Sequence, residues 1–345
     1  HYTVPAEGEP GVETWAGESW KTGGAATWHP GAYDPETDTV FWPTGNPGPD
    51  YSGATRKGDN LFSNSILAVD ARTGARKWHF QTTPHDIWDY DGNTQLFLVD
   101  AERDGETLPA LVQANRNGYF YILDRRDGSF LGAEAYVEQM DWATIDANGR
   151  PVVSEHAANS QRGEVICPGG GGGMNAAWTG AINPNLGLAY IPSTEVCTSY
   201  IPADDTPFIR GLPYMGGTVV VPEPEEGYGN LAAIDVKTGK VRWRHREEEP
   251  IMAGVLSTEG GVVFTGNLQG DALALKAETG ELLWSFRTGS SVRGQPIAYE
   301  LDGEPYVAIP SGAFPGGQAV VVGSTMVPGG AQLYVFKIRK DELPQ

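Results

Sequence analysis

The segment from Thr83 to Asn93 holds the side chains best suited to chemistry. Its acidic and aromatic residues are Asp86, Trp88, Asp89, Tyr90 and Asp91. Residues two apart point the same way in an extended stretch, so we expect Asp89 and Asp91 to converge. Paired carboxylates repel each other unless one takes a proton or both face a cation, so the pair suits a general base or a hard metal ion. A solvated acidic loop is the simpler interpretation, but the interleaved aromatic residues favour partial burial.

Three other segments combine polar side chains with glycine or proline. In the run 44–49, these residues make a rigid loop that would present the amide oxygen of Asn46; the alternative is an ordinary Asn-Pro turn. Arg116 follows a strand and could clamp a carboxylate, or make only a surface salt bridge. The glycine run 169–173 precedes Asn175 and would let the backbone approach a ligand closely, unless it is only a flexible loop.

Several classes of site and partner are excluded by what the chain lacks. It has no phosphate-binding loop, zinc signature or Gly-x-Ser-x-Gly elbow, and its six histidines show no metal-ligand spacing. Cys167 and Cys197 stand outside any Cys-x-x-Cys-His pattern, so no c-type haem is attached; they are two buried thiols or one bridge. The net charge of −20 disfavours nucleic acid and suits a small neutral substrate with a basic redox partner. No apolar run is long enough to span a bilayer.

The elements that must position these residues repeat along the chain. The pattern Asp-x-x-Thr-Gly-x-x-x-Trp occurs at 70–78 and 235–243. It recurs at 276–284 with Lys in the first position, and at 34–42, where the first Asp and the last Trp keep their place and Thr37 and Asp38 stand at the turn. Each copy predicts strand, tight turn and strand, with Trp as a large packing anchor. We therefore expect an all-β fold, a β-propeller of four-stranded blades with a Trp motif.

Grouping the predicted strands gives five blades in one partial propeller domain over 1–345. They are expected at about 25–82, 95–137, 177–246, 253–287 and 295–338, with a long insertion at 197–230 in the third and only three clear strands in the last. A self-contained five-bladed propeller, whose Trp residues only pack blades, is the simpler alternative. Because the sequence begins with His1 and has no signal peptide, we expect a processed product or a fragment.

Taken together and in order, motifs over nearly the whole chain resemble the pyrroloquinoline-quinone (PQQ) alcohol and methanol dehydrogenases, here the C-terminal part of such a chain. The motifs are Gly24–Trp28, Tyr33–Thr37, Thr44–Pro49, Gly58–Ser65, Trp78–Gln81, Thr83–Gly92, Asn115–Gly118 and Gly261–Gly266. Family members have eight blades, so the resemblance implies that about three blades, with a metal-binding Glu and several quinone contacts, are missing here. Where many relatives have Trp, this chain has Met252, which alters the pocket wall.

The resemblance implies a role for each candidate residue. Trp28 would be the floor on which the quinone stacks, and Arg116 and Asn175 would contact the cofactor. Asn46, Asp89 and Asp91 would bind the metal ion, and Asp89 would also be the catalytic base. Cys167 and Cys197 match the position of a structural disulfide in the family, which fits the oxidising periplasm.

The resemblance also implies the metal ion and the reaction. Calcium enzymes of the family usually have a small residue two after the base, whereas lanthanide enzymes have Asp, so Asp91 favours a lanthanide, with Ca²⁺ as the alternative. Asp89 would take the proton of a primary alcohol while hydride passes to the metal-bound quinone, giving an aldehyde. Electrons would then pass to a cytochrome c. The missing N-terminal blades or another subunit would complete this enzyme. The alternatives are an inactive fragment and a non-enzymatic propeller scaffold that binds a protein partner.

Overall fold

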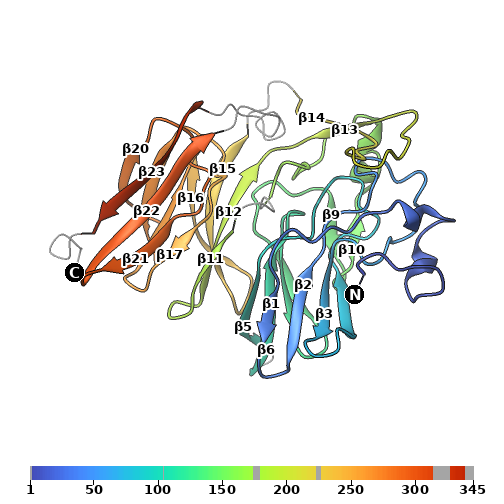
Figure 1. Ribbon diagram of the computed structural model, residues 1–345, viewed down its shortest axis with the longest axis horizontal. Coiled ribbons are helices and arrows are strands. Elements are labelled where there is room, and N and C mark those ends of the chain that lie inside the picture. Colours follow the sequence, from blue (N-terminus) through green and yellow to red (C-terminus); the bar gives the residue numbers. More distant parts are fainter. Residues whose placement is uncertain (1, 104, 174–178, 223–226, 314–326, 339–345) are drawn as a thin grey trace. The chain divides into compact units, whose positions relative to one another are not determined.

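The computed structural model describes residues 2–103, 105–173, 179–222, 227–313 and 327–338, and their regular secondary structure is almost entirely β-strand (Figure 1). The strands of the first half are β1 (Ala32–Asp34), β2 (Thr39–Pro43), β3 (Ser65–Asp70), β4 (Arg76–Gln81), β5 (Leu96–Arg103), β6 (Glu106–Ala114), β7 (Tyr119–Asp124), β8 (Phe130–Ala135), β9 (Ala143–Ile145) and β10 (Pro151–Val153). Those that follow are β11 (Ala181–Asn183), β12 (Leu188–Glu195), β13 (Ser199–Pro202), β14 (Gly217–Val220), β15 (Tyr228–Asp235), β16 (Val241–Glu247), β17 (Leu256–Ser257), β18 (Val262–Gly266), β19 (Asp271–Lys276), β20 (Leu282–Arg287), β21 (Ile297–Leu301), β22 (Glu304–Ala313) and β23 (Gly329–Lys337). The short helices are η1 (Val12–Thr14), η2 (Ser19–Lys21), α1 (Glu155–Ala158) and η3 (Ser160–Arg162).

The chain divides into two compact units, which are described separately here. Unit 1 comprises His1–Ala177, Glu195–Glu225 and Val236–Lys240, and unit 2 comprises Trp178–Thr194, Glu226–Asp235 and Val241–Gln345. Unit 1 holds the antiparallel four-stranded sheets β1-β2-β3-β4 and β5-β6-β7-β8, with the hairpins β9–β10 and β13–β14. Unit 2 holds the sheets β11-β12-β15-β16, β17-β18-β19-β20 and the three-stranded β21-β22-β23. The all-β expectation is confirmed.

The Trp motif joins local turns to packing between sheets. At the β3–β4 turn, the Asp70 carboxylate accepts hydrogen bonds from the backbone of Arg72 and Thr73, so the acid caps its own turn. Trp78 then packs beside Phe41, with ring centroids 5.5 Å apart, and covers Gly128 in the turn of the next sheet. A Cβ on Gly128 would lie 2.7 Å from the Trp78 ring, so glycine is required there. The motif thus encodes both a turn and the contact to the following sheet.

The last sheet of unit 2 is apolar on both faces. On one face Val307 and Ile309 join a buried cluster with Phe264 of β18. On the opposite face, Ile297, Leu301 and Leu333 are 57%, 56% and 65% exposed, and no described residue covers them. The strand register places these three side chains on that single face, opposite to Val307 and Ile309. A contiguous exposed apolar face of this kind is typical of an interaction surface.

Candidate functional site

In unit 1, the Arg116 guanidinium lies close to both predicted acidic residues, Asp89 and Asp91. Its Nη1 atom lies 2.8 Å from Oδ2 of Asp91 and 3.6 Å from Oδ2 of Asp89. The side chains of Arg116 and Asp91 are 11% and 7% exposed, so the pair is largely removed from water. The backbone N–H of Asn46 donates to Oδ1 of Asp91 at 3.3 Å, which brings the loop after β2 to the same place. The structure therefore brings together Asn46, Asp89, Asp91 and Arg116, which are far apart in sequence.

The predicted extended geometry of the acidic segment is wrong. Asp89 has φ 65°, in the left-handed region, and no strand covers it. The two carboxylates converge on Arg116 because the chain turns at Asp89, not because residues alternate along a strand. A left-handed residue other than glycine is uncommon and needs surrounding contacts to hold it.

Trp28 and Gly45 form the wall beside the acids. The Trp28 side chain is 51% exposed, so one part of its ring is free to stack with a planar ligand. A Cβ on Gly45 would lie 2.9 Å from both the Trp28 ring and Oδ1 of Asp91, so only glycine allows the ring to approach the carboxylate. Gly45 was expected only to help make the loop 44–49 rigid, whereas its place beside Trp28 and Asp91 makes it part of the site wall.

Burial dominates the electrostatics of the acids. It raises the pKa of Asp89 well above the usual range, and the neighbouring Arg116 opposes this rise. Burial also raises the pKa of Asp91 to about 6 and that of Asp50 to about 7. In addition, the hydroxyl of Tyr51 donates to Oδ2 of Asp89 at 3.4 Å. Asp50 and Tyr51 were missed by sequence reasoning, although they directly follow the rigid loop 44–49.

The glycine run packs against the protein backbone. A Cβ on Gly173 would lie 2.2 Å from the carbonyl oxygen of Arg116, and one on Gly170 would lie 2.5 Å from that of Trp88. The described part of the run is therefore not a flexible loop. Its glycines allow it to pack closely against the backbone of the segments that carry Arg116 and Asp89. Asn175, the predicted cofactor contact, lies outside the described residues.

The disulfide predicted between Cys167 and Cys197 is present, with the two Cα atoms 4.5 Å apart. It closes a loop with a sequence separation of 30 next to the glycine run. The adjacent Pro168 carbonyl accepts a hydrogen bond from the Tyr90 hydroxyl, which links the bridged loop to the acidic segment.

We expect the double variant C167S/C197S to lower the free energy of unfolding by about 2–4 kcal/mol, because an open chain gains conformational freedom in the unfolded state. Denaturant unfolding followed by tryptophan fluorescence would measure the loss. An unchanged midpoint would show that the bridge does not constrain this chain.

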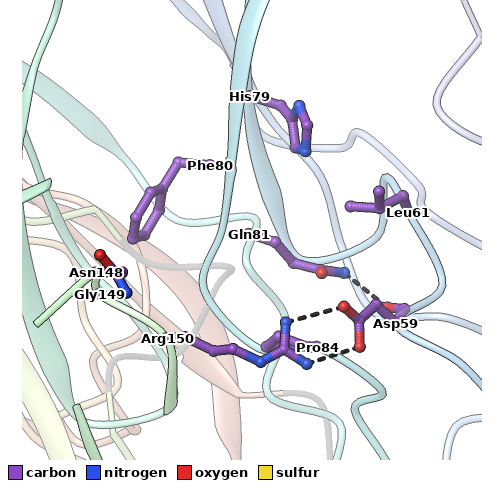
Figure 2. A pocket seen from close by; sticks show the side chains of 9 residues that line it. All are labelled: Asp59, Leu61, His79, Phe80, Gln81, Pro84, Asn148, Gly149 and Arg150. Carbon is purple, nitrogen blue, oxygen red and sulfur yellow. Dashed lines mark hydrogen bonds and ion pairs between the residues drawn. The ribbon is translucent and has the colours of Figure 1, made fainter. Parts of the chain in front are cut away.

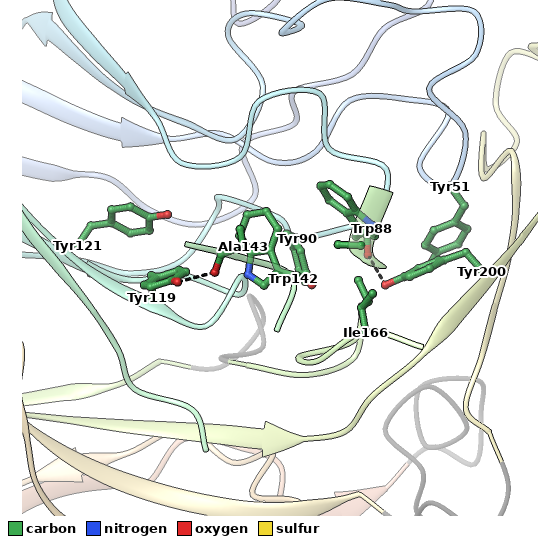
Figure 3. Close-up of a cluster of buried hydrophobic side chains, with 10 residues drawn as sticks. Tyr51, Trp88, Tyr90, Tyr119, Tyr121, Trp142, Ala143, Ile166 and Tyr200 are labelled. Atoms are coloured by element: carbon green, nitrogen blue, oxygen red, sulfur yellow. Dashed lines mark hydrogen bonds between the residues drawn. The ribbon is translucent and has the colours of Figure 1, made fainter. Parts of the chain in front are cut away.

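Aromatic packing fixes the two rings that alternate with the acids. Trp88, Tyr90 and Trp142 lie together in a buried cluster (Figure 3), with ring centroids 5.0 Å apart for Tyr90 and Trp142 and 5.4 Å apart for Trp88 and Trp142. The Trp88 indole N–H donates to the Ser160 hydroxyl at 2.9 Å. These contacts fix the two residues that flank Asp89, whose carboxylate lies 3.6 Å from the Arg116 guanidinium.

A surface pocket of about 230 Å³ lies elsewhere in unit 1 and is lined by none of the predicted site residues. Figure 2 shows its two charged groups paired with each other: Arg150 makes two hydrogen bonds of 2.8 and 2.9 Å to the Asp59 carboxylate. The pocket therefore offers a ligand no free charge.

The polar groups around Arg116 are of the types that bind a planar, oxygen-rich cofactor and a hard metal ion. The Arg116 Nε atom is buried and has no hydrogen-bonding partner among the described residues, which is consistent with a donor that a bound ligand would satisfy. Asn46, Asp89 and Asp91 supply oxygen donors of the kind that hard cations prefer. In the described part of the chain, no group of three or more His, Cys, Asp or Glu side chains is arranged as a metal site.

Comparison with known proteins identifies the family. Residues 1–144 match the model for the glucose/ethanol/alcohol dehydrogenase β-propeller domain, and residues 227–308 match that for outer membrane protein assembly factor BamB. The quinoprotein alcohol dehydrogenase PedH of Pseudomonas putida is 40% identical over 96% of this chain and 58% of its own length. Over most of its length, the chain is similar to PQQ-dependent alcohol dehydrogenases. The resemblance inferred from the motifs is thus confirmed.

Two further relatives of the family agree in sequence and fold. A lanthanide-dependent methanol dehydrogenase of Methylorubrum extorquens is 38% identical over 89% of this chain and 53% of its own length. The solved structure of a europium-containing methanol dehydrogenase matches with a TM-score of 0.85 at 33% identity, over 97% of this chain and 63% of that one. The expected β-propeller class is confirmed by this match. The chain spans little more than half the length of the curated relatives described here.

No helix in the described residues is long and apolar enough to cross a membrane.

Proposed function

We propose that this chain is part of a quinoprotein alcohol dehydrogenase that oxidises primary alcohols to aldehydes and passes electrons to a cytochrome c. The observation that carries the proposal is the convergence of Asp89 and Asp91 on Arg116, at 3.6 and 2.8 Å, beside Asn46. A solvated acidic loop would not bury a guanidinium between two carboxylates. A propeller that only binds a protein partner does not require these polar groups to be buried together, so the scaffold alternative is disfavoured.

Each residue then has a task in the proposed reaction. Asn46, Asp89 and Asp91 would hold the metal ion, while Arg116 and Asn175 would bind oxygens of the quinone stacked on Trp28. The bound quinone and metal would supply the hydride acceptor and the Lewis acid. Asp89 would accept the hydroxyl proton of the alcohol through its carboxylate. Burial raises the pKa of Asp89, which strengthens it as a base, while Arg116 favours its ionised form.

We propose a lanthanide as the metal ion, with Ca²⁺ as the alternative. Asp91 adds a second carboxylate two residues after the base, and a trivalent ion gains more than a divalent ion from that charge. The relative from Methylorubrum extorquens is named for lanthanide dependence, which agrees with this assignment. The Cys167–Cys197 bridge supports a periplasmic location, because disulfides persist in oxidising compartments.

We further propose that the five predicted blades form one partial propeller, completed by further sheets from a longer polypeptide or another subunit. The exposed apolar face of β21-β22-β23 supports this, because Ile297, Leu301 and Leu333 need a cover. The terminal repeat of a self-contained open array would present a polar outer face instead.

Reconstitution tests the proposed activity. The protein would be loaded with PQQ plus La³⁺ or Ca²⁺, and the reduction of a dye by ethanol and by methanol would be followed. We expect alcohol-dependent dye reduction that requires both cofactors, faster with La³⁺. If neither metal promotes quinone binding, this chain alone is an inactive fragment, and intact mass compared with the full reading frame would show whether further blades belong to the same polypeptide.

A further inference from the structure

The acidic segment contains one buried carboxylate that the proposed reaction does not use, that of Asp86. Asp86 is 0% exposed. Its Oδ1 accepts the backbone N–H of Trp88 and its Oδ2 accepts that of Tyr90, both at 2.8 Å. One carboxylate therefore holds the amides on either side of Asp89, the residue with φ 65°. These two bonds close the turn that directs Asp89 toward Arg116.

Asn64 connects this turn to the loop that carries Asn46. Its Nδ2 donates to Oδ2 of Asp86 at 2.7 Å, and its Oδ1 accepts the Gly92 N–H at 2.9 Å. Its own backbone N–H donates to the Gly45 carbonyl at 2.9 Å. Asn64 is fully buried, so these contacts are shielded from competing water. Through its backbone and its side chain, one residue thus connects the residue before Asn46 to the residue after Asp91.

Arg56 makes a parallel connection at the far end of the same loop. Its buried guanidinium donates through Nη2 to the carbonyl oxygens of both Pro49 and Asp86. Its Nη1 donates to Oδ1 of Asn60 at 2.9 Å. The loop 44–49 is therefore linked to the acidic segment at two separate points.

We propose that Asp86 and Asn64 are a positioning pair that sets the separation between Asn46 on one loop and Asp89 and Asp91 on the other. Neither residue lies among the proposed ligand-contacting groups, so the pair would act only through the backbone it holds. The inference rests on the proposed function for its role in metal binding. The hydrogen bonds themselves stand independently of that function.

The variant Asp86→Asn tests the pair with little change in shape. In this variant the side-chain amide nitrogen, a donor, would face at least one backbone N–H that now donates to the carboxylate. That hydrogen bond would be lost, so the turn at Asp89 would loosen. Asp124→Asn is the matched control: Asp124 is also a buried turn carboxylate of unit 1, and it accepts the backbone N–H of Arg126 at 2.9 Å. Both variants would be compared with the wild type by hydrogen–deuterium exchange and by Tb³⁺ luminescence titration.

We expect Asp86→Asn to speed exchange in the peptide covering Trp88 to Gly92 and to weaken Tb³⁺ binding, each by about tenfold, since a buried hydrogen bond is lost. Asp124→Asn should leave both readouts at the wild-type value. Unchanged exchange in that peptide, or an equal effect in the control, would overturn the inference. If the wild type itself binds no Tb³⁺, the proposed metal site is wrong, while the exchange comparison still decides the positioning role.

Asn64→Gly provides a second variant if Asp86→Asn does not fold. Asn64 has φ 44°, which glycine adopts without strain, so the change removes the bridge and leaves the two bonds from Asp86 to the turn. We expect faster exchange at Gly92 and weaker Tb³⁺ binding. Wild-type exchange at Gly92 in this variant would also contradict the proposal.

Discussion

The variant Asp89→Asn is expected to keep its fold and to lose alcohol oxidation by about 10²–10⁴-fold, the usual contribution of a positioned general base. The amide is nearly the same size as the carboxylate but cannot accept the hydroxyl proton. The Tyr51 hydroxyl, now 3.4 Å from Oδ2, can still donate to the amide oxygen, so the local structure has a replacement contact. Dye reduction under saturating PQQ, metal and ethanol would measure the loss.

Two controls distinguish a loss of proton transfer from a loss of PQQ or metal binding in that experiment. The unfolding midpoint should match the wild type, and PQQ binding should be followed by its absorbance, because Asp89 is also a proposed metal ligand. Tyr51→Phe is the matched comparison, since it removes a hydroxyl next to Asp89 but leaves the carboxylate in place. Turnover retained in Asp89→Asn with full PQQ loading would remove Asp89 as the base.

The variant Asp91→Ala is expected to shift metal preference from lanthanide to calcium. Loss of one carboxylate lowers the negative charge and the number of oxygen donors, which costs a trivalent ion more than a divalent one. The relative affinities of La³⁺ and Ca²⁺ would be measured by competition against Tb³⁺ luminescence, together with activation of dye reduction by each ion.

Asp91 also pairs with Arg116 at 2.8 Å, so its removal could act through the guanidinium instead of the metal ion. In Asp91→Asn the amide oxygen can still accept a hydrogen bond from Arg116 and contact the metal ion, while the negative charge is lost. A metal preference in Asp91→Asn equal to that in Asp91→Ala would therefore assign the effect to charge. An unchanged ratio of La³⁺ to Ca²⁺ affinity in Asp91→Ala would refute the assignment of Asp91 as the lanthanide-selecting residue.

Local features of the fold could be predicted because neighbours in sequence determine them. In the motif at 70–78, the Asp70 side chain caps the turn that immediately follows it, and Gly74 takes the left-handed conformation with φ 70°. Such turns depend on hydrogen bonds between residues two or three apart. The repeated Trp then indicates packing between sheets, and Trp78 against Gly128 shows how that contact is made.

The geometry of the site was predicted less well, because it depends on contacts between distant segments. Alternation along a strand suggested that Asp89 and Asp91 converge, but the left-handed turn at Asp89 brings them together instead. The carboxylate of Asp86 holds that turn through the amides of Trp88 and Tyr90, but Asp86 is itself held by Asn64, 22 residues away. The glycine run likewise proved to cover the backbone of Arg116.

The sequence by itself determined the strand-and-turn repeat, since the repeat follows from residue types and short spacings. It also indicated the family resemblance and the candidate site residues. Only the tertiary structure decided which side chains meet. Arg116 reaches Asp91 across 25 residues, and Asn46 reaches Asp91 across 45. Those contacts arise because packed sheets bring loops from different strands to one place. Burial there also shifts the pKa values of the acids, since desolvation acts only once the chain has folded around them.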